Sequence, residues 1–200
     1  MLLNDYRAEI DRMIIAGLDE SISNGSTAHA AIIIERMFKH ANSSMKILTR
    51  IFNPQIFGQP EVLQYADAFL ADTTNHTCEV LVEEYDPDYN NTHPFVRMFS
   101  GRKNVKILQL PDGLGSVINS NFAVMDNRGV RMETERASPK ALANFGDIKF
   151  AGRMTGFFDV LLPLGTQVTL DGAAAARETA LAGGAGPMIK LPTDAPLTAG

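Results

Sequence analysis

Five short apolar runs constrain the fold of this chain more than any other feature. Each run spans six to eight residues and is bordered by turn residues or by segments with helical periodicity. Runs of this length and composition are typical of buried strands. The predicted strands are Met45–Phe52, Cys78–Tyr85, Asn104–Leu110, Asn121–Asp126 and Val130–Glu135. The sequence "DNRG" between the last two predicts a hairpin.

Apolar residues at helical spacing predict helices around these strands. The predicted helices are Asp5–Leu18, a second one capped by Ser26 or Thr27, one from Pro60 to Leu70, a short one in "PFVRMFSG", and a last one capped by Asp147 and ended by Pro163. The last helix is expected to bury Phe150, Met154, Phe157, Phe158 and Leu161. This alternation predicts an α/β sandwich with a mixed β-sheet flanked by helices.

The organisation of the chain follows from its length and from one change in composition. A chain of 200 residues suits one domain with a hydrophobic core. Residues 1–40 are predicted to form a helical segment packed on an α/β domain at 41–168. Residues 169–200 are rich in Ala, Gly and Pro, which predicts a tail or partner-binding arm.

Charge and cysteine content narrow the classes of function. The net charge is −5, which does not favour binding to nucleic acid, although nucleic acid remains a candidate partner. The single cysteine, Cys78, excludes an intrachain disulfide and a cysteine-based metal site. The sequence shows no signal peptide, membrane span or cofactor motif. We therefore expect a cytoplasmic protein with neither a membrane partner nor a cofactor.

Residues 41–168 resemble one phospholipase D-like domain. Members of that superfamily carry His-x-Lys-x4-Asp on a late strand, and then a second strand that ends near Gly-Ser-x-Asn. Alignment of the aspartate on Asp126 places Asn121 at the lysine and Asn119 at the histidine, and Glu135 falls near the later asparagine. The segments "ALANF" and "DIKFAGRMTGFFDVL" are similar to those that close such domains.

The resemblance also implies a loss of chemistry. In active members an imidazole attacks phosphorus, a second imidazole protonates the leaving oxygen, and lysine neutralises phosphate charge. A carboxamide such as Asn119 neither titrates near neutral pH nor attacks phosphorus effectively. Asn121 supplies only a neutral dipole in place of a cation. We therefore predict that the motif is degenerate and the domain catalytically inactive, with no resident metal.

The hairpin carries the candidate site. Arg131, Glu133 and Glu135 alternate along a predicted strand and so share one of its faces. They could form a charged pocket in place of the phosphate site, or a polar sheet face or salt-bridged subunit contact. The candidate ligand- or phosphate-binding residues are Asn119, Asn121, Asp126, Arg131, Glu133 and Glu135.

Three functional hypotheses follow. The leading one is a non-catalytic binding or assembly module, a regulatory or structural subunit that forms a homodimer or a heteromeric complex through the hairpin and the last helix. Pairing is implied by the resemblance, because active relatives commonly combine two such domains. The alternative is a metal-dependent phosphodiesterase or nuclease in which Asp126, Glu133, Glu135 and His93 hold a divalent ion. The third is a regulatory subunit in bacterial defence or nucleic-acid metabolism.

Overall fold

The centre of the protein is a mixed β-sheet, seen in a computed structural model that describes residues 2–86, 88, 91–114, 118, 120–133 and 140–168. Within these residues the sheet has eight strands in the order β1-β7-β6-β5-β2-β3-β4-β8. The strands are β1 (Ser21–Asn24), β2 (Ser44–Thr49), β3 (Thr77–Val82), β4 (Val105–Gln109), β5 (Asn121–Met125), β6 (Gly129–Glu133), β7 (Ala141–Asn144) and β8 (Thr166–Gln167).

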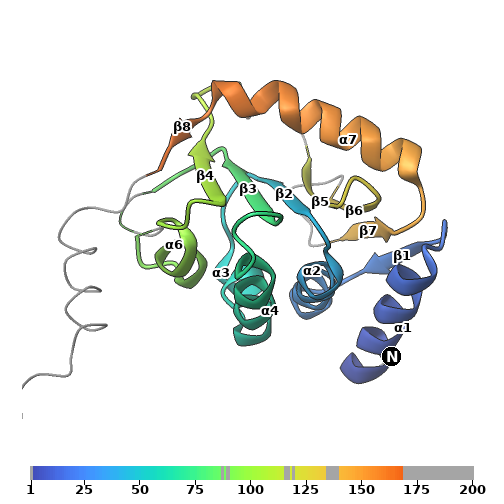
Figure 1. The fold of residues 1–200 in the computed structure, drawn as a ribbon. Helices are drawn as coiled ribbons and strands as arrows, with labels where there is room; N and C mark the ends of the chain where they lie inside the picture. Colours follow the sequence, from blue (N-terminus) through green and yellow to red (C-terminus); the bar gives the residue numbers. More distant parts are fainter. Residues whose placement is uncertain are drawn as a thin grey trace, which may run out of the picture. The chain divides into compact units, whose positions relative to one another are not determined.

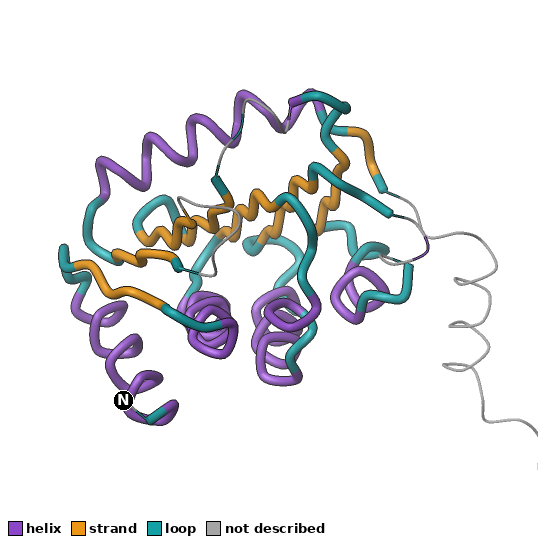
Figure 2. The backbone as a smooth tube through the Cα atoms, turned by 180° about the vertical axis from the view of Figure 1, so that it is seen from behind, coloured by secondary structure: helices purple, strands orange, loops and turns teal. Residues whose placement is uncertain are grey.

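Helices cover both faces of the sheet (Figure 1). One face carries α1 (Leu3–Ala16), α2 (Thr27–His40), α3 (Pro54–Phe57), α4 (Pro60–Leu70) and α6 (Pro94–Phe99). The opposite face carries α7 (Ile148–Leu161), which runs across the strands and continues into the short 3-10 helix η2 (Leu162–Leu164), as Figure 2 shows from behind. In the described part of the chain, no helix has both the length and the apolar character needed to cross a bilayer.

The strand directions confirm the predicted mixed sheet. Strands β2, β3 and β4 are parallel neighbours, whereas β5, β6, β7 and β1 add antiparallel strands on the other side of β2. All five predicted strands lie in this one sheet, and β5 and β6 form the predicted hairpin. Strands β1, β7 and β8 were not predicted. Strand β1 reads "SISN" and lies at the sheet edge, so it lacks the apolar pattern of a buried strand.

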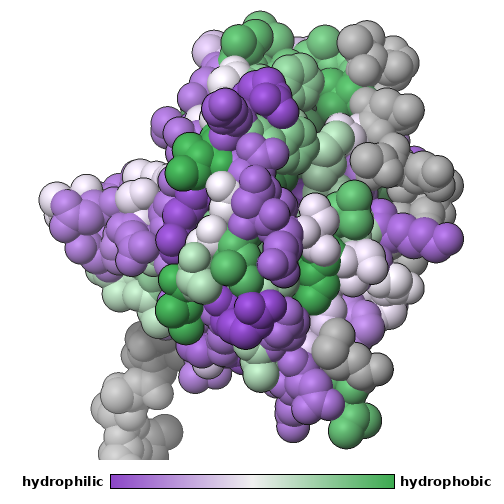
Figure 3. All heavy atoms as spheres, turned by 90° about the vertical axis from the view of Figure 1, so that its right-hand side faces the viewer, coloured by the Kyte–Doolittle hydropathy of each residue, from purple (hydrophilic) through white to green (hydrophobic). Residues whose placement is uncertain are grey.

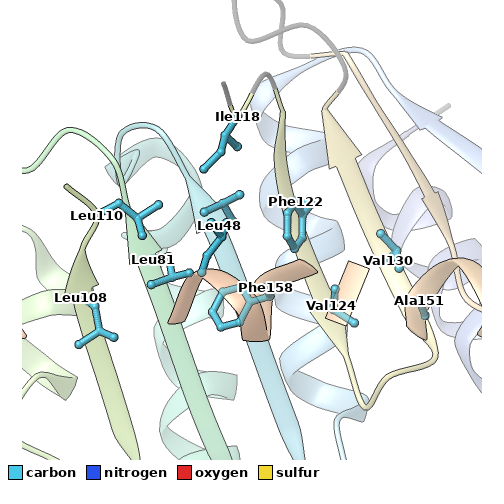
Figure 4. Packing of buried hydrophobic residues seen from close by; sticks show 11 residues of the cluster. Leu48, Leu81, Leu108, Leu110, Ile118, Phe122, Val124, Val130, Ala151 and Phe158 are labelled. Atoms are coloured by element: carbon cyan, nitrogen blue, oxygen red, sulfur yellow. The ribbon is translucent and has the colours of Figure 1, made fainter. Parts of the chain in front are cut away.

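The core between the sheet and α7 is aliphatic, with phenylalanine at its centre (Figure 4). Neighbouring strands contribute Leu48, Leu81 and Leu108, and α7 lays Phe158 on them. The apolar face predicted for this helix is only partly correct. Phe158 and Leu161 are buried, and Phe150 and Met154 pack partly buried against the core, but Phe157 is exposed and Ala151 is buried in addition. The inward face is therefore rotated away from Phe157 and is narrower than predicted.

The N-terminal helix is fixed by both apolar and charged contacts. Tyr6, Ile10, Met13 and Ile14 of α1 are buried, as their spacing predicts. Glu35 of α2 is also buried and lies 3.2 Å from the guanidinium of Arg7 in α1. Because a buried carboxylate is tolerated only beside a cation, this pair ties α1 to α2.

Candidate functional site

Polar side chains gather at one edge of the sheet, which we call the polar edge. The register places Leu48 beside Phe122, so the carboxyl end of β2 lies next to the start of β5. Asn121 pairs with Glu133, and this brings the end of β6 to the same edge. Strand β1 also ends there, because Asn24 pairs with Ala141 at the start of β7. Five strand ends thus converge on a small region.

At the polar edge, Asn24, Asn121, Arg131 and Glu133 form one hydrogen-bonded group, which we call the buried polar cluster. The guanidinium of Arg131 lies 2.5 Å from a carboxylate oxygen of Glu133 and donates from Nε to Asn24 at 3.2 Å. Only 5% of the Arg131 side chain and 11% of the Glu133 side chain are exposed. One positive and one negative charge therefore neutralise each other away from water.

Asn121 closes the cluster toward β2. Its carboxamide nitrogen donates to the second oxygen of Glu133 at 2.8 Å, and its oxygen accepts from the backbone N–H of Arg50 at 2.8 Å. Tyr6 of α1 is buried, and this burial raises the pKa of its hydroxyl to about 12. The positive charge of Arg131 acts in the opposite direction and lowers that pKa. Asn121 therefore uses both ends of its amide to hold the site together.

Asp126 lies at the opposite end of the hairpin and does not belong to this site. Its carboxylate accepts hydrogen bonds from the backbone N–H groups of Asn42, Ser43 and Ser44 at 2.8, 2.8 and 3.0 Å. Its own backbone is left-handed, with φ 51°, at the turn between β5 and β6. Asp126 thus braces the turn against the start of β2, away from the other predicted site residues that the structure describes.

The same geometry separates two members of the metal set of the alternative hypothesis, Asp126 and Glu133. Glu133 is level with Asn121, five residues before Asp126 along β5, which separates the two carboxylates by about 16 Å at the usual strand rise. No group of three His, Cys, Asp or Glu within the described residues could hold a metal ion. Asn119 and Glu135, the remaining predicted site residues, lie outside the described residues.

His93, the imidazole of that metal set, has a structural role. It caps α6, where its Nδ1 accepts from the backbone N–H of Phe95 at 3.1 Å, and its ring packs 4.6 Å from the ring of Phe52. Burial lowers the pKa of His93 to about 4, so the ring is neutral in the folded protein at neutral pH. The contacts of His93, a helix cap through Nδ1 and ring packing against Phe52, are therefore structural ones.

The lowered pKa of His93 makes stability depend on pH. The unfolded chain binds this proton near pH 6.5, so the contribution is present above that pH and is lost as the pH falls toward 4. His93→Asn keeps a capping acceptor and removes the titration. We expect the variant to lose less stability than the wild type between pH 7 and pH 5, measured by urea unfolding at both values. Equal losses would contradict this role of His93.

An acidic cleft opens beside the buried polar cluster, past the carboxyl ends of β3 and β4. It measures about 540 Å³ and is lined by Ile51, Glu83, Glu84, Tyr85, Asp86, Gln109 and Asp112. Arg50, which follows β2, forms an ion pair with Glu84 at 3.1 Å. The run "VEEYD" after the second predicted strand supplies three of its four acidic side chains. Ligands of open parallel sheets commonly bind at such ends.

Comparisons with known proteins place this fold among solved structures. No protein-family model and no curated protein matches the sequence. NucT from Helicobacter pylori superposes with a TM-score of 0.55 at 13% identity, covering 74% of this chain and 100% of that one. Nuc from Salmonella typhimurium, described as a phospholipase D family member, gives 0.50 at 13% identity, covering 74% of this chain and 99% of that one.

A third structure with this fold carries a different description. TrmBL2, described as an archaeal chromatin protein with a novel mode of DNA binding, gives a TM-score of 0.54 at 9% identity. The match covers 82% of this chain and 62% of the chromatin protein. At identities this low, the three likenesses show a shared fold, and function has to be argued from the site itself.

Proposed function

We propose that this chain, which has a phospholipase D-like fold, is a non-catalytic binding or assembly module and works as a regulatory or structural subunit of a larger complex. One observation carries the proposal: the guanidinium of Arg131 is buried and neutralised by Glu133 at 2.5 Å. A cation that stabilises a phosphoryl transition state must be able to reach the phosphate. Arg131 is instead committed to the protein's own interior.

The surrounding groups support the same conclusion. Asn121 offers a carboxamide whose two ends are already bonded, so it supplies neither a nucleophile nor a charge. The adjacent cleft is lined by Glu83, Glu84, Asp86 and Asp112, whose negative charges would repel a phosphodiester. A phosphodiester at the polar edge would therefore meet these carboxylates, and the neighbouring cation, Arg50, is already paired with Glu84.

Two further observations support binding as the function. The fold is shared with TrmBL2, described as an archaeal chromatin protein with a novel mode of DNA binding, so a chain with this fold can serve binding. The net charge of −5 favours a protein partner over nucleic acid for this chain. We propose that the partner is a second copy or another protein subunit.

The proposal predicts that the protein does not cleave phosphodiesters. The substrates are bis(p-nitrophenyl) phosphate and a fluorescent single-stranded oligonucleotide, each incubated with EDTA, Mg²⁺ or Mn²⁺. We expect rates equal to those of buffer, because the cluster offers neither a titrating nucleophile nor an accessible cation. Cleavage above that background would contradict the proposal.

Glu133→Gln serves as the matched variant in this assay. Activity that is equal in the wild type and Glu133→Gln, and that stays with the protein through further purification, would contradict the proposal without involving Glu133. Metal-stimulated activity that is lost in Glu133→Gln would favour the metal-dependent alternative. A covalent phosphohistidine trapped from the wild type would restore the mechanism of the active family.

A further inference from the structure

Asn24, the residue that β1 contributes to the buried polar cluster, is followed directly by a glycine. Because glycine has no side chain to shield its backbone nitrogen, this nitrogen can approach the carboxamide of a preceding asparagine. At Gly25 no atom of a more distant residue lies within 4 Å of the position that a side chain would take. No other asparagine in the sequence precedes a glycine. The cluster therefore contains the chain's one labile Asn-Gly pair.

The folded structure protects this pair from reaction. Asn24 is 1% exposed, and its side-chain oxygen accepts a hydrogen bond from Nε of Arg131 at 3.2 Å. Its backbone pairs with Ala141 of β7 in a strand. Closing a ring between the side chain and the next backbone nitrogen requires a different backbone rotation from the extended one of a strand. A reaction at Asn24 therefore requires β1 to open.

Strand β1 is an element from which local opening is expected. It is four residues long and lies at the end of the sheet, where β7 is its only neighbour in the described part of the chain. Of its residues only Asn24 is buried. Figure 3 looks onto the side of the molecule where Figure 1 places β1, and hydrophilic residues make up much of that face. Short edge elements with few buried contacts open at a fraction of the free energy of global unfolding.

From these observations we propose that Asn24 is a deamidation site whose reaction requires β1 to open. The backbone nitrogen of Gly25 loses its proton and attacks the side-chain carbonyl carbon of Asn24. The new carbon–nitrogen bond closes a cyclic succinimide, and the carboxamide nitrogen leaves as ammonia. Water then opens the ring and gives aspartate or isoaspartate. Water is the only co-reactant, so no oxidant, reductant or cofactor is needed.

The product changes the charge balance of the buried polar cluster. Before the reaction, Arg131 and Glu133 neutralise each other. Aspartate at position 24 adds a second carboxylate beside one guanidinium, which leaves a negative charge uncompensated away from water. Isoaspartate also inserts a carbon into the main chain, so the register between β1 and β7 cannot be kept. Either product should release β1 from the sheet, and refolding does not reverse the change.

The first test follows the reaction in the full chain. The protein is kept folded in mildly alkaline buffer, and peptide mapping by mass spectrometry measures the fraction of Asn24 converted to acid over time. Gly25→Ala should lower the rate by about an order of magnitude, because the methyl group obstructs the attacking nitrogen. Alanine fits here, since the position is open and the φ of Gly25 lies outside the left-handed region.

Two results of this test would overturn the proposal. Conversion in urea without conversion in the folded protein would show that β1 does not open. A rate that Gly25→Ala leaves unchanged would show that the succinimide is not formed.

The second test changes the opening of β1 without touching the reacting residues. Tyr6→Phe removes the hydroxyl that donates to the backbone carbonyl of Ser23 at 3.3 Å. Because opening of β1 breaks this hydrogen bond, the variant should open more often and convert about fivefold faster. Tyr85→Phe is the matched control, since its hydroxyl donates to Asn91 at 3.1 Å, after β3. Equal rates in Tyr6→Phe and the wild type would contradict a reaction that requires β1 to open.

The third test measures the consequence of the reaction. Asn24→Asp reproduces one product, and Asn4→Asp adds the same charge at an exposed position of α1. Hydrogen–deuterium exchange of the β1 and β7 amides should be severalfold faster in Asn24→Asp and in deamidated protein, and unchanged in Asn4→Asp. Wild-type exchange in both modified proteins would show that the reaction does not release β1. Neither phosphodiesters nor partners enter these experiments, so their failure is distinguishable from failure of the non-catalytic proposal.

Discussion

Arg131→Met is expected to lower the free energy of unfolding by about 3–5 kcal/mol, the usual cost of removing one partner of a buried ion pair. The variant leaves the Glu133 carboxylate in the interior, and among the described residues the amide of Asn121 is its remaining side-chain donor. It also removes the hydrogen bond that links Arg131 to Asn24 in β1. Urea unfolding at neutral pH measures the change.

Two control variants sharpen this prediction. Arg131→Met combined with Glu133→Leu removes both charges and should recover most of the lost stability, because an apolar pair of similar volume often replaces a buried ion pair without loss. Arg12→Met breaks the exposed pair with Glu9 and should change stability far less than Arg131→Met does, because exposed ion pairs contribute little. If Arg131→Met lowered the free energy of unfolding as little as Arg12→Met does, the buried pair of Arg131 and Glu133 would not contribute to stability as predicted.

Asp126→Ala is expected to destabilise the protein by about 2–4 kcal/mol, since hydrogen bonds to a charged group contribute about 1.5–3 kcal/mol each and the site is only half-buried. The backbone N–H groups of Asn42, Ser43 and Ser44 lose their shared acceptor. Alanine is also strained at φ 51°. Thermal and urea unfolding should report the same direction of change.

Asp126→Gly separates the two contributions. Glycine adopts a positive φ without strain, so this variant loses only the hydrogen bonds. We expect it to retain about 1 kcal/mol more stability than Asp126→Ala. If both variants unfold like the wild type, the carboxylate does not brace the turn.

The central strands were predictable because burial on both faces makes their sequences continuously apolar. The run "MKILTRIF" was predicted as a strand at Met45–Phe52. The observed strand β2, Ser44–Thr49, overlaps it, but starts one residue earlier and ends three residues earlier. The edge strand β1 lacked this signal, since only Asn24 in it is buried. Its pairing with β7 depends on a tertiary contact that no local window contains.

Only one property of the candidate site could be predicted from the sequence, the alternation of its charged residues along one strand. The spacing of Arg131 and Glu133 correctly placed them on one face of a strand. It did not show that they bind each other, because that depends on α1 and β1 covering the face. The motif position of Asp126 gave its order along the chain, but not its distance from Arg131 and Glu133, which depends on the hairpin that reverses direction immediately after it.

The pairing of β1 with β7 also bears on how the chain reaches this structure. Asn24 meets Ala141, and Met45 of β2 meets Met125 of β5, so two pairings of the sheet join residues that are far apart in the sequence. Closing such loops costs entropy before the contacts form, which slows folding. During synthesis, β1 emerges long before β7 and must wait for it with its edge unsatisfied. The polar sequence of β1 suits that interval, because an unpaired strand with polar side chains is a poor template for aggregation.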